Sequence, residues 1–412
     1  AAALCEAGDL EAADAAIRRA LDLDPERPES RFNQGVVRKA QGRWQEAAQC
    51  FHRAAELKQV STPEHPHPEH PGIYFWQTAA EAWMLAGDPL QAVRAFQSAL
   101  LAHGPQATPR RARCLVDLAG TLDELCHYDL AEIALREALS IEPTSAAAWN
   151  LLGNVQRAQG NYDGAQHAFK HLLTLNTHNV AALGNLGTVC HLRGDNADAI
   201  DYFRQTLAAD PSLGVMWTNL GNVLTYALDH GPEEVRAAFE DWDRQIAQPL
   251  LDLRPHPNSP DPKRRLRVGY VSPDFRKHAV AYFALPLLSQ HDPAKVEVFC
   301  YYAHRQQDEW TARFQRVADH WREVAQLDDA ALAEQIRQDG IDLLVDLSGH
   351  TEGNRLLAFA RKPAPVQITW MGYVTTTGLG TMDWRITHAD ADPAGSESHY
   401  TRSEERRVGK QC

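Results

Sequence analysis

The segment 149–175 reads WNLLGNVQRAQGNYDGAQHAFKHLLTL, and it decides the fold of the first part of the chain. Its first half begins with the pattern W-x2-L-G at Trp149, and Gly160 marks a turn. In the second half, small and aromatic residues recur at i, i+3 and i+4 from Ala165 to Phe169. This spacing gives one apolar face to each half, so the segment predicts two amphipathic helices joined by a glycine turn.

The same pattern returns along the chain with a period of 34 residues. Gly8 and Gly42 are 34 residues apart, and so are Gly160 and Gly194. Cys126 fills the same slot 34 residues before Gly160. A period of this length is typical of a helix–turn–helix solenoid, and the repeats resemble the tetratricopeptide repeat family.

The first predicted domain, residues 1–248, contains six repeats and a degenerate seventh that ends the array. Prolines after Asp24, Glu142 and Asp210 stop helices at the repeat boundaries. An insertion of 11 residues, 61–71, alternates proline with histidine; we interpret it as an extended loop rather than a metal site. The predicted repeats span 1–24, 30–58, 73–102, 112–143, 146–177 and 180–211, with the seventh at about 214–248.

Asparagines recur at two slots of the first helices. Asn33, Asn185 and Asn219 precede the helix glycine, while Asn154 and Asn222 follow it. First helices line the concave face of such a solenoid, and an asparagine offers both a donor and an acceptor. We therefore expect a ladder that binds the backbone of an extended acceptor peptide; the alternative is that these side chains cap or join helices.

The periodicity changes after residue 248. Five prolines between 249 and 262 indicate a linker, taken as 249–265. Beyond it, short β-rich runs alternate with helical segments, which predicts a parallel sheet with helical crossovers. The predicted strands are 266–271, 296–302, 341–347, 366–370 and 384–387, and the predicted helices are 282–289, 308–318 and 328–339.

Polar residues follow three of these strands, at 272–278, 348–355 and 372–378. Ligands of open α/β sheets bind beyond the carboxyl ends of the strands, so we expect the functional site at these tips. Neither G-x-G-x-x-G after the first strand nor a P-loop is present, which disfavours nicotinamide and ATP as ligands.

Three blocks, 268–278, 339–355 and 361–373, resemble the catalytic region of O-linked N-acetylglucosamine transferases. The chain is most similar in arrangement to the bacterial members of this family, which, like its plant fucosyltransferase-like branch, place tetratricopeptide repeats directly ahead of the catalytic part. The resemblance covers about 146–395 and implies that 266–395 is the Rossmann-like first lobe of a GT-B glycosyltransferase. It further implies a metal-independent transfer of a sugar from a UDP donor to Ser or Thr of proteins, without a cofactor.

The resemblance also suggests site residues. His278 is expected to face the active site, either as a base or in positioning the acceptor or sugar. Asp274 is expected to brace the same loop by accepting backbone N–H bonds. His350 and Thr351 would line the cleft near the donor sugar; Arg355 would lie at the start of the next helix, with a surface ion pair as the alternative. The third block adds Tyr373, Thr376, Thr377 and Gly378.

The chain departs from the family pattern in two places. Val374 and Thr375 stand where the family has Pro-Gly, so a preset turn is lost. The segment 396–412 continues no strand–helix pattern, and we interpret it as an artefactual tail on a chain truncated before the second lobe. One lobe offers half a cleft, so we expect such a fragment alone to be inactive.

Composition limits the alternatives. The net charge of −13 and the lack of a basic stripe argue against nucleic acid, and no apolar run is long enough for a membrane span. Seven scattered cysteines without C-x-x-C disfavour zinc and disulfides and suit a reducing, cytoplasmic setting. The expected partners are acceptor proteins and a UDP-sugar, and the repeats could also form a homodimer.

We therefore expect a protein O-glycosyltransferase that uses UDP-GlcNAc, with the repeats holding the acceptor. GDP-fucose is the alternative donor. The alternative function is a catalytically inactive, peptide-binding scaffold.

Overall fold

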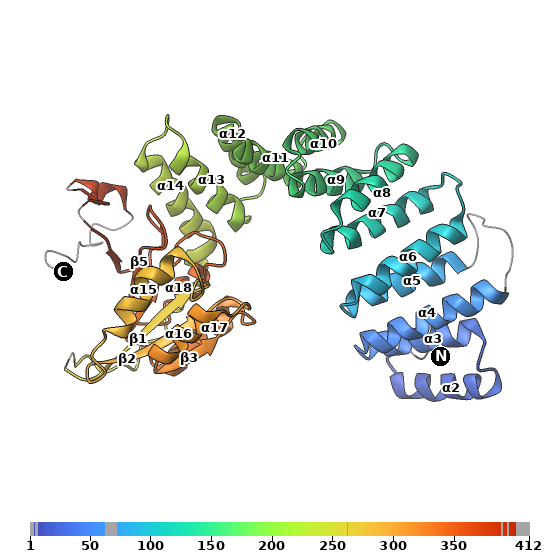
Figure 1. Ribbon diagram of the computed structural model, residues 1–412, viewed down its shortest axis with the longest axis horizontal. Helices are drawn as coiled ribbons and strands as arrows, with labels where there is room; N and C mark the ends of the chain where they lie inside the picture. Colours follow the sequence, from blue (N-terminus) through green and yellow to red (C-terminus); the bar gives the residue numbers. More distant parts are fainter. Residues whose placement is uncertain are drawn as a thin grey trace. The chain divides into compact units, whose positions relative to one another are not determined.

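The computed structural model describes residues 4, 7–61, 72–261, 263–388, 390–393 and 395–400. These residues form two compact units, of which the first runs to Arg193 and the second begins at Gly194 (Figure 1). Residues 62–71 of the predicted loop 61–71, and residues 401–412 of the predicted tail, lie outside the described residues.

The first unit consists of helices that follow one another in antiparallel pairs, as the 34-residue period predicts. Helix α2 ends at Leu23 and α8 ends at Ile141, each just before the capping residue and proline that were predicted to stop it. The helices are α2 (Leu10–Leu23), α3 (Pro28–Ala40), α4 (Trp44–Ser61), α5 (Gly72–Leu85), α6 (Pro89–His103), α7 (Pro109–Glu124), α8 (Tyr128–Ile141), α9 (Ala146–Ala158), α10 (Tyr162–Leu175) and α11 (Val180–Arg193).

The turns between paired helices use a left-handed backbone. Gly42 and Gly160 have φ of 73° and 77°, which glycine adopts at little cost. Cys126 occupies the same slot and has φ of 59°, one of the positive values at non-glycine residues. The prediction that Cys126 replaces a turn glycine is therefore confirmed.

The glycine inside each first helix makes room for a ring on the second helix. A Cβ placed on Gly35 would lie 2.6 Å from the ring of Phe51, and one on Gly153 would lie 2.5 Å from the ring of Phe169. Any larger side chain would have to displace a fully packed aromatic ring. These contacts explain why the repeat pattern pairs a glycine with a downstream phenylalanine.

The second unit begins with helices of the same kind, α12 (Asn196–Ala209), α13 (Gly214–Tyr226) and α14 (Pro232–Trp242). A Cβ on Gly221 of α13 would lie 2.3 Å from the ring of Phe239 on α14, so the repeat contact continues here. A π-helical turn, Asp243–Ala247, and a 3-10 turn, Gln248–Leu250, follow α14. Helices α12 to α14 belong to the second compact unit, although the sequence predicts that they are part of the repeat domain 1–248. The predicted domain boundaries therefore stay a prediction.

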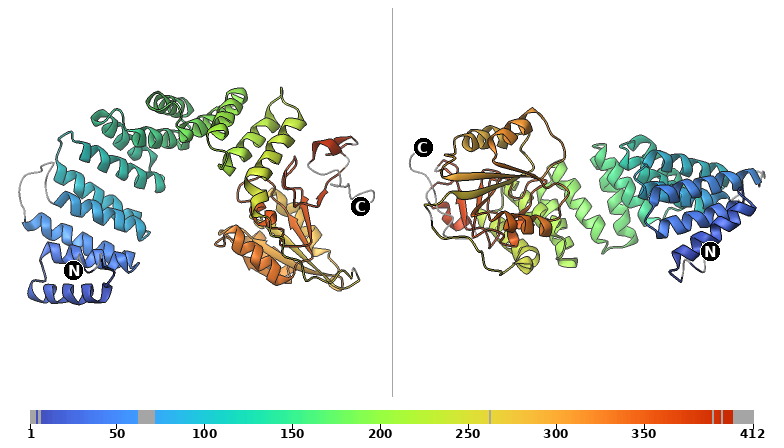
Figure 2. Two further views of the ribbon diagram at one scale, coloured as in Figure 1. Left: turned by 180° about the vertical axis from the view of Figure 1, so that it is seen from behind. Right: turned by 90° about the horizontal axis from the view of Figure 1, so that it is seen from below.

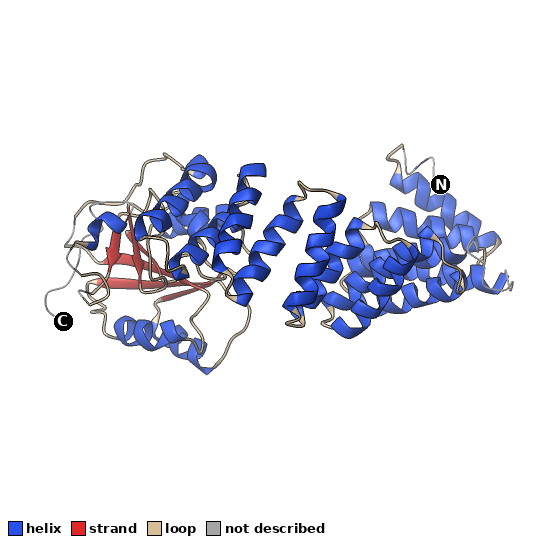
Figure 3. Ribbon diagram, turned by 90° about the horizontal axis from the view of Figure 1, so that it is seen from above, coloured by secondary structure: helices blue, strands red, loops and turns tan. Residues whose placement is uncertain are grey.

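A six-stranded parallel sheet in the order β3-β2-β1-β4-β5-β6 follows, with helices on both of its faces (Figure 3). The five predicted strands are present, and β3 is an edge strand that the sequence pattern did not indicate. The strands are β1 (Leu266–Ser272), β2 (Val296–Tyr302), β3 (His320–Glu323), β4 (Leu343–Asp346), β5 (Val366–Trp370) and β6 (Trp384–Ile386). The helices are α15 (Ala279–Ser289), α16 (Glu309–Val317), α17 (Asp329–Asp339) and α18 (Leu356–Ala360), with a 3-10 turn at Ser396–His399.

Alternate residues of β2 enter two apolar layers. Cys300 packs in the layer with α15 and α16, while Phe299 and Tyr301 pack in the layer with α17 and α18. Trp242 and Ala247 belong to that second layer, so α14 and its π turn form part of the core of the lobe. The views of Figure 2 place α14 beside the sheet accordingly.

Candidate functional site

Three loops meet at the carboxyl ends of β1, β4 and β5, which is the edge that the sequence predicts to carry the site. A Cβ on Gly353 would lie 3.1 Å from Pro273, so the second loop lies against the first. A Cβ on Gly349 would lie 2.2 Å from the Cβ of Tyr373, so the third loop lies against the second. The glycines of these loops are thus explained by close contact between them.

His278 lies in the first loop and caps the N-terminus of α15. Its Nδ1 accepts a hydrogen bond from the backbone N–H of Val280 at 3.3 Å, and 43% of its side chain is exposed. A ring that accepts at Nδ1 carries its proton on Nε2 when neutral. In this arrangement His278 therefore offers a hydrogen-bond donor at Nε2 to a ligand.

Asp274 is buried beside His278, with its Oδ2 3.5 Å from the Nδ1 atom of His278. Burial raises the pKa of Asp274, while the charges of His278 and Arg276 oppose the shift. A buried carboxyl with a raised pKa next to an exposed imidazole is an arrangement often found in active sites.

Asp274 does not brace its loop in the way the sequence suggested. Within the described chain, no backbone N–H donates to its carboxylate; its own N–H donates to Ser272 Oγ at 2.9 Å. The loop is held from outside by Asp308, whose Oδ2 accepts from the N–H of Lys277 at 2.7 Å. Asp308 also caps α16 and was not singled out from the sequence.

The carboxylate that does brace a loop is Asp346, at the end of β4. It accepts from the N–H groups of Ser348 at 3.1 Å and Gly349 at 2.9 Å, and from the hydroxyl of Thr369 at 2.9 Å. Burial raises its pKa, and these three donors partly offset the shift. Asp346 lies inside the predicted strand 341–347, so its place in the sequence did not mark it as a loop residue, whereas Asp274 follows the predicted strand 266–271.

His350 lies deeper than a cleft-lining residue would. It is 3% exposed, stacks on Phe239 at 4.1 Å between ring centroids, and meets Trp242 edge-on at 4.8 Å. Its Nε2 donates to the carbonyl of Thr377 at 2.8 Å, and burial lowers its pKa to about 4. His350 is therefore neutral at pH 7 and joins α14 to the loops.

Thr376, Thr377 and Gly378 are likewise packed rather than exposed. Both threonines are 1% exposed, and their hydroxyls accept from backbone N–H groups two residues on. Gly378 has φ of 69°, and a Cβ there would lie 2.4 Å from the carbonyl oxygen of Phe239. This segment thus holds the loop against α14.

Thr351 and Arg355 differ in accessibility. Thr351 is exposed, and its hydroxyl donates to the carbonyl of Ser348 at 2.8 Å. Arg355 is the residue before α18, and its side chain is only 11% exposed. It is paired with Asp329 at 2.5 Å and donates to two carbonyls, so it fixes the segment before α17 rather than forming a surface ion pair.

The third loop lacks the Pro-Gly turn, and Arg385 of β6 holds it instead. This guanidinium donates to the carbonyls of Tyr373, Val374 and Thr375, at 3.3, 3.2 and 2.8 Å. Arg385 is 8% exposed and was missed, because its position in a short strand gave no functional signal. Side-chain hydrogen bonds thus do the work of a preset turn.

The asparagine slots have mixed surroundings. Asn185 donates to Asn150 Oδ1 at 3.3 Å, which is a contact between first helices. Asn222 of α13 accepts from the hydroxyl of Tyr373, so it joins the last repeat to the third loop. Asn33, Asn154 and Asn219 are half-buried on α3, α9 and α13. Their binding of peptide stays a prediction.

Within the described residues, three or more His, Cys, Asp or Glu side chains nowhere gather as a metal site would require. The same residues include no helix that is long and apolar enough to cross a bilayer.

Comparison with known families decides what this architecture is. Residues 252–405 match the glycosyl transferase family 41, and residues 1–62, 117–165 and 144–212 match tetratricopeptide repeat families. The chain therefore joins tetratricopeptide repeats to a family 41 glycosyltransferase domain. The family 41 match runs past the predicted end of the lobe at residue 395.

The structure is consistent with that longer extent of the family 41 domain. Arg385 is paired with Asp392 at 3.2 Å, and Asp392 accepts from the hydroxyl of Tyr400. Arg236 of α14 donates to the carbonyl of Ser398 at 2.9 Å. Residues 396–400 thus pack on the lobe, although they were predicted to belong to a tail.

Curated relatives of the chain are named as probable UDP-N-acetylglucosamine–peptide N-acetylglucosaminyltransferases. The probable UDP-N-acetylglucosamine–peptide N-acetylglucosaminyltransferase SPINDLY of Petunia hybrida is 35% identical over 198 residues, covering 47% of this chain and 21% of the relative. The SPINDLY protein of Arabidopsis thaliana is 39% identical over 176 residues, covering 42% and 19%. The chain thus spans about a fifth of the length of these relatives.

Among solved structures, a mutant of the Thermobaculum terrenum O-GlcNAc transferase matches with a TM-score of 0.60 and 36% identity. The match covers 72% of this chain and 57% of that one. The chain therefore has the fold of an O-GlcNAc transferase-like protein over two parts, a superhelix of tetratricopeptide repeats and then the parallel sheet of the first GT-B lobe.

Proposed function

We propose that this protein transfers N-acetylglucosamine from UDP-GlcNAc to Ser or Thr hydroxyls of proteins, with the repeats holding the acceptor. The observation that supports this most directly is the pair of exposed His278 and buried Asp274 at the carboxyl edge of a family 41 domain. The names of the relatives support the donor and the class of acceptor.

In this proposal His278 is a positioning donor. Its Nδ1 is occupied by the N–H of Val280, so its Nε2–H is free to hydrogen-bond an oxygen of the acceptor or the sugar. An inverting transfer requires the hydroxyl to lie behind the anomeric carbon, and a fixed donor at the rim of the site limits that geometry. The buried carboxyl of Asp274 lies 3.5 Å from Nδ1 of His278, on the side of the ring away from Nε2, and packs against the ring there.

Buried side chains hold the loops around this pair by hydrogen bonds. Asp346 fixes the second loop through buried hydrogen bonds, and Arg385 fixes the third loop through three carbonyls. A preorganised loop keeps its polar groups in place without a reorganisation cost when the reaction occurs. We assign these two residues to positioning and not to contact with substrate.

The test is a transfer assay with the protein as its gene encodes it. UDP-GlcNAc and GDP-fucose are supplied in parallel to a mixture of Ser/Thr peptides, and mass spectrometry identifies the sugar and the modified residue. Transfer of N-acetylglucosamine supports the proposal, and transfer of fucose alone overturns the donor assignment. Peptide binding without transfer of either sugar favours the scaffold function.

The proposal also includes transfer without a metal and a cytoplasmic location. Nucleotide-sugar transfer that continues unchanged in excess EDTA supports the first part, and transfer restored only by Mg²⁺ or Mn²⁺ contradicts it. Fractionation of the source cells tests the second part. Homodimer formation through the repeats is open to measurement by sedimentation.

A further inference from the structure

Helix α15 has an unusual composition for a helix on the surface of a lobe. Its sequence from Ala279 to Ser289 contains no charged residue, yet Tyr282, Phe283 and Leu287 are 55%, 64% and 40% exposed. A helix that is apolar on all sides is normally covered by other protein. The outer side of α15 is therefore a candidate for a binding surface.

A groove of about 470 Å³ lies where α15 runs beside α16. The ring of Tyr282 meets the ring of Trp310 at 4.6 Å between centroids, so the aromatic side chains come from both helices. The groove is lined by Tyr282, Pro286, Trp310, Arg313, Arg316 and Val317, among others.

The rim of the groove on α16 is cationic. The guanidinium of Arg313 lies 4.3 Å from the centre of the Trp310 ring, which fixes its position by a cation–π contact. Arg316 lies one turn further along the same helix. Neither arginine forms an ion pair within the described part of the chain, although the protein as a whole has a net charge of −13.

We propose that the groove between α15 and α16 binds an acidic amphipathic helix of a partner protein. Apolar residues of such a helix, spaced at i, i+3 and i+4, would cover Tyr282 and Trp310, as in other helix-in-groove complexes. Its carboxylates would pair with Arg313 and Arg316, the uncompensated cations of this surface. His278, which caps the N-terminus of α15, does not line this groove, and the proposal does not depend on the proposed transfer reaction.

The probe is a synthetic peptide of about 16 residues, long enough to form a helix, with leucines on one face and glutamates flanking them. Binding of the fluorescein-labelled peptide to the full chain is measured by fluorescence anisotropy. We expect saturable binding that weakens as salt increases, because surface ion pairs are screened. A peptide of the same composition with a scrambled order is expected not to bind.

Charge reversal in Arg313→Glu/Arg316→Glu is expected to weaken binding about tenfold or more. The matched control is Lys295→Glu, which reverses a cation that is 80% exposed on the same lobe but outside the groove. Tyr282→Ala tests the apolar part and is also expected to weaken binding about tenfold. Circular dichroism verifies that each variant is folded.

Equal affinity of the wild type and the Arg313→Glu/Arg316→Glu variant would overturn the proposal. So would equal weakening by Lys295→Glu, because attraction to the net charge of the lobe would then suffice. Binding of the full chain to vesicles of phosphatidylserine but not to the acidic peptide would show that the surface is a lipid site instead.

Discussion

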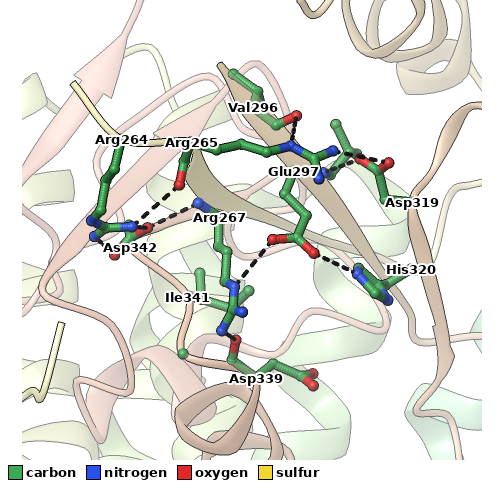
Figure 4. A network of polar contacts seen from close by, with 12 residues as sticks. Arg264, Arg265, Arg267, Val296, Glu297, Asp319, His320, Asp339, Ile341 and Asp342 are labelled. Atoms are coloured by element: carbon green, nitrogen blue, oxygen red, sulfur yellow. Dashed lines mark hydrogen bonds and ion pairs between the residues drawn. The ribbon is translucent and has the colours of Figure 1, made fainter. Parts of the chain in front are cut away.

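The charged side chains at the amino ends of the strands, here called the amino edge of the parallel sheet, differ in their pairing from those at the carboxyl ends, the carboxyl edge. At the amino edge, residues 258–267, 296–297, 319–320 and 339–342, each charged side chain that Figure 4 labels has a partner of opposite charge. Asp342 accepts from Arg264 at 2.7 Å, from the N–H of Arg267 at 2.8 Å and from Asn258 at 2.7 Å. At the carboxyl edge, loops 272–278, 347–355 and 371–379, Asp346 is buried without an ion pair among the described residues. Asp274 is buried with only longer contacts, to Arg276 at 3.8 Å and to His278 at 3.5 Å.

The comparison is sharpest at strand β4, where Asp342 directly precedes the strand and Asp346 is its last residue. The guanidinium of Arg264 and the surrounding N–H groups hold the pKa of Asp342 below its ordinary value, against the opposing effect of burial. Burial raises the pKa of Asp346 at the other end. A carboxylate that is paired with a cation stabilises the fold. A buried carboxyl whose pKa is raised destabilises the fold at neutral pH, and such groups are found where a protein holds a loop or a functional site in place.

The largest difference between the two edges should be the effect of a substitution on the rate of sugar transfer. We expect His278→Ala to reduce the rate of sugar transfer about 100- to 1,000-fold, because it removes a fixed hydrogen-bond donor that positions the acceptor or the sugar. His320→Gln is the matched control at the amino edge, where His320 is bonded to Glu297 at 2.8 Å. It should leave the transfer rate nearly unchanged.

His278→Asn separates the role in catalysis from the role as a helix cap. Asparagine is among the best capping residues, so it keeps the hydrogen bond to the N–H of Val280. Recovery of the wild-type rate in His278→Asn would show that only the cap matters. A rate as low as that of His278→Ala supports the proposed role of the imidazole.

The second prediction concerns the stability of the amino edge. Asp342→Ala is expected to lower the free energy of unfolding by about 2–3 kcal/mol, since it removes the acceptor of the Arg267 N–H and one acceptor of the Arg264 guanidinium, which keeps its hydrogen bonds to the carbonyls of Ser259 and Arg265. Urea unfolding followed by circular dichroism measures the change. Glu309→Ala, at an exposed position of α16, is the control and should change it by less than about 0.5 kcal/mol.

If Asp342→Ala lowers the free energy of unfolding by less than about 1 kcal/mol, the ion pairs and hydrogen bonds of the amino edge contribute little to stability. Arg264→Met in the Asp342→Ala background provides a further check. If the cost comes from an unpaired buried charge, removal of the second partner should restore part of the lost stability.

Much of the fold could be predicted because the sequence carries local periodicity. The repeat turns follow from glycine at fixed spacing, and the longer strands follow from continuous apolar runs such as 296–302. Strand β3, His320–Glu323, has no such run and exists because it pairs with β2 at the edge of the sheet. Its formation depends on a long-range contact that no local pattern contains.

The location of the candidate site could be predicted from the sequence, but the burial and the hydrogen-bond partners of its side chains could not. The rule for open α/β sheets placed the polar loops correctly at one edge. The burial of His350 depends on Phe239 and Trp242 of α14, which belong to the repeat region of the sequence. Arg385 was missed for a similar reason, since the carbonyls that it binds belong to a different loop.

The third prediction tests this unexpected brace at the carboxyl edge. Arg385→Met removes donors to the third loop and leaves Asp392 without its buried partner, so we expect a loss of about 2–3 kcal/mol. Hydrogen exchange at 373–375 should become faster than in the wild type, while exchange in β2 should change only as far as global stability does. Unchanged exchange at 373–375 would contradict the proposed brace.

The smallest effects should come from pH, and they have opposite signs at the two ends of β4. For Asp342, the lowered pKa means that its stabilising contribution is complete above the ordinary pKa of about 3.9 and is lost as the pH falls below it. For Asp346, the raised pKa means that, as the pH rises, this carboxyl loses its proton in the unfolded state at a lower pH than in the folded state. Stability therefore falls as the pH rises above about 3.9 towards the raised value.

The variants Asp342→Asn and Asp346→Asn isolate these slopes, which amount to about 1.4 kcal/mol for each unit of pKa difference. The stability difference between wild type and Asp342→Asn should shrink as the pH falls below about 4. The difference between wild type and Asp346→Asn should instead be largest at low pH and shrink as the pH rises. Urea titrations between pH 3 and pH 7, a range chosen about the ordinary carboxyl pKa, measure both. Slopes of the same sign would show that Asp346 is compensated as fully as Asp342, and the contrast between the two edges would then rest on His278 alone.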